Sequence, residues 1–431
     1  MKASRGKSKV SVTMATLRSR FSQTHTLGGL ALTLALIFGS GCNNPTTPVA
    51  TSTPVASATP QSSNSPTAEA SPVSYEEIAR LYQEPAEESG NGWPELQKFL
   101  AGSQDGGSSG MEVASALDLS EPADAATFDS KILPLLKSAF QKSAFTGAPK
   151  LLSGQDPINP YYRDLRALCD LLTQRADQLQ SSGKKEQAVE LVGLPLALAH
   201  ALQSRPETVS VNDFSSKYAA ASLATIADWA STNALSAPQL DQLLALLAKY
   251  RPDYHHMVLS ISVDFVQLEN SLDDQGVRTE ILGLGLSRPE EIQGWKDQLR
   301  ALRVDAEKLY GVAPIDAKAF NDVIAKLAGP IQGIVIDYPN VAALQKRSYA
   351  SYLATELALT LEKHRLSKPK EGLTPEQAFQ QTFGSDTTSA KVAEAMLEVR
   401  TGKNPGQFTV AGRPGMFALV SPDPHVVFYE R

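Results

Sequence analysis

Two adjacent histidines, His255 and His256, are the residues of this chain whose types come nearest to a metal site. They follow Asp253, and Asp264 and Glu269 come later in the same predicted helix, so imidazole and carboxylate groups of the kinds that bind zinc share one stretch. Adjacent helical residues point about 100° apart, whereas helical metal sites use ligands three or four residues apart. We therefore expect two histidines at a helix start, one of them partly buried, and neither a bound metal nor a cofactor.

Three further patterns suggest catalysis only weakly. Ser181 and Lys184 have the spacing of a serine/lysine pair, but they occupy a polar turn and the companion motifs of such enzymes are missing. The pair Gly283 and Gly285 lacks the third glycine and the preceding strand of a nucleotide-binding loop. Cys169 lies among leucines at helical spacing, which favours a small buried apolar residue over a nucleophile. The sequence therefore leans towards a protein that is not an enzyme.

The charge balance argues against nucleic acid as a partner. The chain has 431 residues and 42% hydrophobic content, enough to bury a large core. Without residues 1–41 it has 34 basic and 46 acidic residues, a net charge of −12, and no basic cluster that would hold phosphates. Only two cysteines, Cys42 and Cys169, are present, so the sequence shows no disulfide framework.

The N-terminal residues have the order of a secretory signal. Six basic residues and no acidic residue precede an apolar run from Leu30 to Phe38, in which Thr33 is the one polar residue. That run is too short to span a bilayer, which needs ~20 apolar residues. Residues 1–41 are therefore predicted to be a signal peptide.

The end of this signal, Gly39-Ser40-Gly41-Cys42, resembles the lipobox of bacterial lipoproteins. The resemblance implies that a signal peptidase cuts between Gly41 and Cys42 and that the Cys42 thiol takes a diacylglycerol, so that Cys42 incorporates palmitate and the membrane becomes a partner of the chain. Asn43 follows the cysteine, which in this class favours the outer membrane where the source has one. The alternative is an ordinary secretory signal that is cut at another small residue.

Residues 42–74 read as a disordered tether. The stretch from Asn43 to Ser74 contains six prolines, many small polar residues, a single charged residue, Glu69, and no aromatic residue. Such a composition cannot bury enough apolar surface to offset the loss of backbone entropy. We expect this segment to be sensitive to proteases in the intact protein.

Residues 75–366 form the predicted helical body. Apolar residues recur three and four positions apart, most regularly from Tyr162 to Leu202, where Ser182-Gly183 interrupts the pattern and predicts a helical hairpin. The last long helix begins at Asn340 and places Leu344 and Leu353 on its apolar face. We found no fixed repeat of 33 to 47 residues. The predicted fold is therefore mainly α, an irregular antiparallel helical array that is α-solenoid-like or a bundle.

Residues 367–431 form a predicted small α+β piece. Thr374 to Gln377 has the pattern of a capping box, and apolar residues from Val392 to Val399 suggest a second helix. Three β-like runs follow at 407–410, 416–420 and 426–429, which predicts a two- or three-stranded meander. Because so small a sheet is not stable alone, we expect it to dock on the last long helix.

The order of these parts resembles an uncharacterised family of bacterial envelope proteins with a C-terminal end similar to that of pseudopilins. The resemblance rests on the turn Asn91-Gly92-Trp93-Pro94, on the hairpin LRALCDLL…QAVELVGLPLALAHAL, on the late helix 348–364 and on the β end 406–429. It implies a place in the cell envelope but no activity. In that family the β end carries an Asp-Pro turn and a Gly-Asp segment, which Pro422-Asp423-Pro424 matches only loosely, so calcium binding and pilin-like assembly are not carried over.

Three functions are compatible with this sequence. The favoured one is a lipid-anchored, helical binding or scaffolding module with a protein partner in the cell envelope. A second is a hydrolase of envelope polymers whose site is assembled only by the fold. A third is an accessory subunit of a secretion or pilus apparatus, which rests on the pseudopilin-like end.

Overall fold

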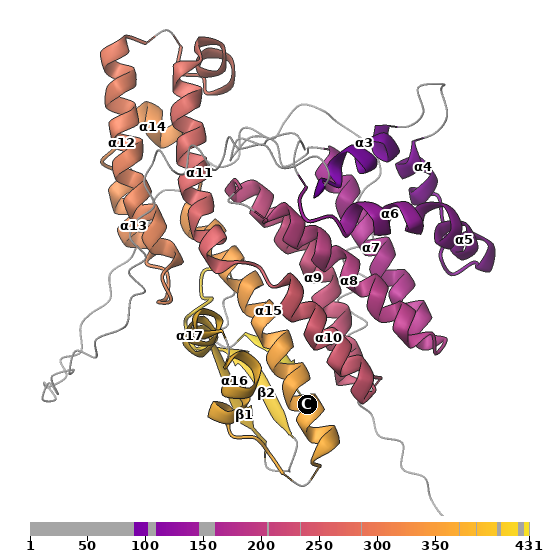
Figure 1. Ribbon diagram of the computed structural model, residues 1–431. Helices are drawn as coiled ribbons and strands as arrows, with labels where there is room; N and C mark the ends of the chain where they lie inside the picture. Colours follow the sequence, from indigo (N-terminus) through magenta and orange to yellow (C-terminus); the bar gives the residue numbers. More distant parts are fainter. Residues whose placement is uncertain are drawn as a thin grey trace, which may run out of the picture. The chain divides into compact units, whose positions relative to one another are not determined.

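The computed structural model describes most of residues 90–430, all of which fall within the unit Glu69–Arg431 (Figure 1). Cys42, the signal peptide, the tether and the beginning of the helical body lie outside the described residues. The described ranges are 90–101, 109–145, 160–204, 207–232, 234–285, 287–369, 371–384, 386–402, 407–420 and 426–430.

The fold is mainly α with a small C-terminal β meander, as the sequence predicts. The helices that lead up to the predicted hairpin are α3 (Trp93–Ala101), α4 (Gly110–Ser115), α5 (Pro122–Thr127), the π-helix η2 (Phe128–Ile132) and α6 (Leu133–Phe140). The remaining helices are α7 (Pro160–Ser181), α8 (Lys185–Leu202), α9 (Val209–Ser231), α10 (Ala237–Tyr250), α11 (Tyr254–Asp273), the π-helix η3 (Val277–Ile281), α12 (Pro289–Glu307), the 3₁₀-helix η4 (Lys308–Tyr310), α13 (Ala317–Ile324), α14 (Gly329–Ile334), α15 (Tyr338–Ser367), α16 (Pro375–Phe383) and α17 (Thr387–Met396). None of the helices that the structure describes is both long and apolar enough to cross a membrane.

The predicted helical hairpin is confirmed as α7 and α8. The turn between them is a Schellman motif: Gly183 has φ +81°, the Lys184 N–H donates to the Leu179 carbonyl at 2.9 Å, and the Gly183 N–H donates to the Gln180 carbonyl at 3.2 Å. Helix α8 is buried along most of its length because it packs against α6, α7, α9 and α10. It forms the centre of the helical body.

The 30-residue helix α15 connects most parts of the unit. It contacts α9 and α10, the helices α16 and α17, and the sheet strands (Figure 1). Leu353 is fully buried as predicted, but Leu344 is 41% exposed, which corrects the predicted apolar face. At that turn the neighbouring polar residues Gln345 and Lys346 are the buried ones.

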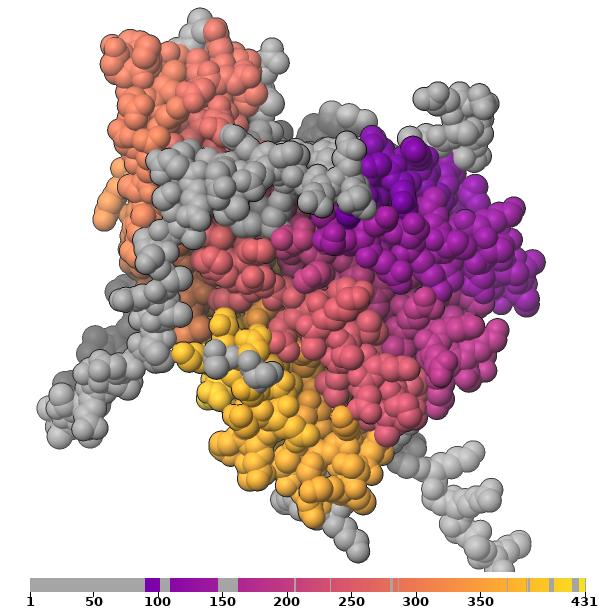
Figure 2. Space-filling view, viewed as in Figure 1, coloured from indigo at the N-terminus to yellow at the C-terminus, as the bar shows by residue number. Residues whose placement is uncertain are grey.

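The C-terminal sheet has three antiparallel strands in the order β1 (Leu397–Thr401), β2 (Phe408–Gly412) and β3 (Val427–Glu430). Strands β2 and β3 confirm two of the predicted β-like runs. Strand β1 was not predicted, because the apolar spacing up to Val399 indicates a helix. The run 416–420, predicted as β-like, is a turn. Strands β2 and β3 pack on α15, as expected for a sheet too small to stand alone, and Figure 2 shows the C-terminal residues in yellow beside this helix.

Candidate functional site

The two histidines lie in the first turn of helix α11, directly after its N-cap. Asp253 is the N-cap of α11, and its Oδ1 accepts a hydrogen bond from the His255 N–H at 2.8 Å. His255 is exposed, whereas His256 is partly buried with Nδ1 3.0 Å from the Gln203 carbonyl oxygen. In the described part of the chain no three His, Cys, Asp or Glu residues are placed to hold an ion.

The carboxylates further along α11 serve other helices. Asp264 is buried, and its Oδ1 accepts a hydrogen bond at 3.1 Å from the Val209 N–H, the first residue of α9. A carboxylate there complements the partial positive charge of a helix N-terminus. Glu269 is also buried and pairs with Arg300 at 2.9 Å. Both acidic residues near the histidines therefore stabilise the packing of helices.

The other candidate catalytic residues, Ser181, Lys184 and Cys169, lie in or beside helix α7. Ser181 ends α7, the backbone of Lys184 closes the Schellman turn, and both residues are exposed. Cys169 is fully buried, and burial raises the pKa of its thiol well above the ordinary value. The predicted burial of Cys169 among apolar residues is confirmed.

A buried ion cluster centred on Arg251 joins the helical body to the C-terminal piece. The Arg251 guanidinium, 13% exposed, donates to both oxygens of Glu356 on α15 at 2.8 and 2.9 Å. It also donates to Asp386 at 2.6 Å and lies 5.5 Å from the centre of the Phe383 ring. Asp386 is the N-cap of α17, so one side chain fixes three parts of the fold.

The pKa values of the two carboxyl groups in this cluster are shifted in opposite directions. Burial raises the pKa of Glu356, and the bond with Arg251 opposes that rise without cancelling it. Burial also acts to raise the pKa of Asp386, but hydrogen bonds from Ser389 and the charge of Arg251 outweigh it and hold the pKa below its ordinary value. The cluster is tightly paired, which favours a structural role over a catalytic one.

Lys346 is a second buried charged residue, and its ammonium group is hydrogen-bonded to backbone carbonyl oxygens. Its side chain is fully buried, and Nζ donates to the carbonyl oxygens of Gly311 at 2.6 Å, Ala313 at 2.7 Å and Leu309 at 3.4 Å. These carbonyls lie at and just beyond the C-terminal end of η4, where a cation complements the helix dipole. Burial lowers the pKa of Lys346 to about 8.

Replacing Lys346 by methionine is expected to change how stability depends on pH. Between pH 8 and 10.5 the unfolded chain still holds the lysine proton that the folded chain has released, so a rising pH favours the folded state. The free energy of unfolding of the wild type, minus that of Lys346→Met, should therefore rise by about 1.4 kcal/mol per pH unit in this window. Urea unfolding of both proteins at several pH values measures the difference, and a difference that is constant with pH would contradict the prediction.

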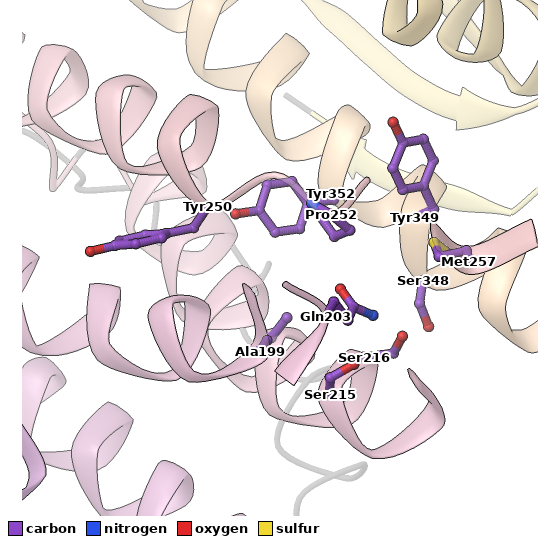
Figure 3. Close-up of a pocket in the computed structure, with 11 residues that line it drawn as sticks. Ala199, Gln203, Ser215, Ser216, Tyr250, Pro252, Met257, Ser348, Tyr349 and Tyr352 are labelled. Atoms are coloured by element: carbon purple, nitrogen blue, oxygen red, sulfur yellow. The ribbon is translucent and has the colours of Figure 1, made fainter. Parts of the chain in front are cut away.

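A small cavity lies beside the Arg251 cluster, between α8, α9, α11 and α15 (Figure 3). It has room for about one water molecule. Tyr352 borders it, and its buried hydroxyl, which has no hydrogen-bond partner among the described residues, points towards Tyr250. The hydroxyl of Tyr349 points away, to Ser389. The cavity is too small for a substrate.

A larger, open groove lies between α8 and α10. Its volume is about 370 Å³, and most of it is open to solvent. The half-buried Leu246 and the exposed Ala245 contribute apolar surface to it, whereas Val189 is buried beneath it. The residues that line the groove are Glu186, Val189 and Glu190 on α8, and Gln242, Ala245, Leu246 and Lys249 on α10. This groove can receive part of another molecule, and no motif in the sequence marked it in advance.

Comparisons with protein-family models, with curated proteins and with solved structures return no match to this chain. The resemblance to bacterial lipoproteins and to the envelope family therefore stays a prediction from the sequence.

Proposed function

We propose that this chain is an exported, lipid-anchored protein of the cell envelope whose helical body binds a protein partner. The observation that carries the binding role is the open groove between α8 and α10. The buried charges described above, by contrast, are paired with one another or with helix ends. Paired helices that leave a groove between them are a common way of building a protein-binding surface.

The anchoring rests on the sequence. The basic leader, the short apolar run and the small residues before Cys42 are what lipid attachment at that thiol requires. A single acyl chain gives only weak membrane binding, whereas several chains on one residue hold a protein stably. The proposed protein is therefore held at a membrane surface, and the outer membrane is its favoured location if the source has one.

Replacing Cys42 by serine is expected to abolish lipid labelling and to move most of the protein from the membrane to the soluble fraction. The measurement is the incorporation of labelled palmitate in the native host, together with fractionation and mass spectrometry of the mature N-terminus. Cys169→Ala is the control, because that buried residue is the other cysteine and its variant should keep both label and anchoring. A wild type that takes up no palmitate, or whose N-terminus is not Cys42, would refute the anchoring.

A further inference from the structure

The groove between α8 and α10 follows α10 for about two turns and α8 for little more than one turn. Its lining residues span Glu186 to Glu190 on α8 and Gln242 to Lys249 on α10. Seven residues of a helix cover about 10 Å, so the α10 side has the length of two helical turns of a partner. Gly193 lies on the same face of α8 as Glu186 and Val189. It has no side chain, and a Cβ at this position would lie 3.2 Å from the Leu246 side chain. The two helices therefore approach closely beneath the groove.

The two helices run in the same direction, which sets the order of charges along the groove. Gly193 on α8 lies beside Leu246 on α10. At the other end Gln239, in the first turn of α10, donates to Gln180 at 2.9 Å, just before the turn that leads into α8. With this alignment Glu186 lies near the start of α10, and Lys249 lies about 15 Å further along. The groove is thus acidic at one end and basic at the other.

The acidic end has a carboxylate free to pair with a partner. Glu190 forms an ion pair with Lys137 of α6 at 2.7 Å, whereas Glu186 is exposed and has no ion pair with any residue that the structure describes. Lys249 is exposed at the other end, where it donates to the hydroxyl of Tyr250 at 3.0 Å. Opposite charges at the two ends select one orientation of an occupant more strongly than they add affinity.

From this geometry we infer that the groove binds an amphipathic helix of a protein partner. The contact face of that helix carries a lysine or arginine that faces Glu186, aliphatic residues over Ala245 and Leu246, and an aspartate or glutamate near Lys249. A helix fits because the α10 side of the groove is about two turns long and places these two apolar side chains between the charged ends, which suits anchors at positions i, i+3 or i+4, and i+7. This inference rests on the proposed binding function and names its partner.

The test is a selection of helical peptides of about 14 residues, four turns, from a displayed library against the intact protein. Enriched peptides should carry aliphatic residues at the helical spacing and a basic residue at one end. They should bind the Ala245→Arg variant at least tenfold more weakly, because arginine at this exposed position fills the groove. Ala248→Arg is the matched control: Ala248 is exposed on α10 outside the groove, and its variant should bind like the wild type.

A charge exchange tests the orientation. Glu186→Lys should weaken binding of the enriched peptides, and replacing their basic residue by glutamate should restore it. The inference is overturned if no peptide is enriched, if enriched peptides bind Ala245→Arg as tightly as the wild type, or if the charge exchange has no effect. Lipid labelling at Cys42 is measured separately, so failure of the groove and failure of the anchoring are distinguishable.

Discussion

Replacing Glu356 by glutamine is expected to lower the free energy of unfolding by about 3–5 kcal/mol, because it leaves the buried Arg251 without its main counter-charge. Both oxygens of Glu356 bond Arg251, and the glutamate side chain is 3% exposed. An amide can accept one of these bonds but carries no charge. The measurement is urea unfolding followed by the helical circular dichroism signal.

Two further variants make this prediction specific. Asp322→Asn, which breaks the exposed pair between Lys318 and Asp322, should cost less than about 1 kcal/mol. The double variant Arg251→Met with Glu356→Leu should be more stable than Glu356→Gln, since it removes both buried charges together. A Glu356→Gln variant as stable as the wild type would show that the charge of Glu356 does not stabilise the fold.

Raising the pH above 10 is expected to unfold the protein within one to two pH units. Burial raises the pKa of six tyrosines above the ordinary value of 10, to about 12 for Tyr349 and in the same direction for Tyr218, Tyr254, Tyr310, Tyr338 and Tyr352. Above pH 10 the unfolded chain loses these protons while the folded chain keeps them, so stability falls as pH rises. Six groups at about 1.4 kcal/mol per unit amount to about 8 kcal/mol per pH unit, comparable with the whole stability of a domain.

Tyrosinate absorbance and the helical signal, recorded together during an alkaline titration, check this prediction. They should change in one cooperative step. The Tyr352→Phe variant should unfold at a slightly higher pH, because it removes one of the six groups and the lost hydroxyl bonds no residue that the structure describes. Gradual ionisation of the tyrosines near pH 10 with the helices intact would contradict the prediction.

Local patterns were sufficient to predict much of the fold. The break at Gly183 and the capping box at Thr374, whose side chain accepts from the Gln377 N–H at 3.2 Å, are set by residues close in sequence. Strand β1 was missed because the spacing of Val392, Met396 and Val399 also fits a helix. Pairing with β2 makes residues 397–401 a strand, and periodicity alone does not show such pairing.

The buried polar groups could not be predicted, since their partners are distant in sequence. Arg251 bonds residues 105 and 135 positions away. Near the start of α15 the hydrophobic pattern is locally inverted: Leu344 is exposed, while the buried Gln345 donates to the Val209 carbonyl at 3.1 Å. Hydrophobic spacing identifies a buried face only by its apolar residues. A helix face that is buried through polar side chains, such as Gln345, is therefore wrongly predicted to be exposed.

The position of α15 in the chain has a consequence for biosynthesis. This helix covers faces of α9 and α10, yet it is completed only at Ser367 of 431 residues. A growing polypeptide therefore exposes the apolar faces of those earlier helices until most of it has left the ribosome. Folding of the body is consequently a late event that awaits the distal end, and a nascent chain shortened before residue 338 lacks the helix that completes it.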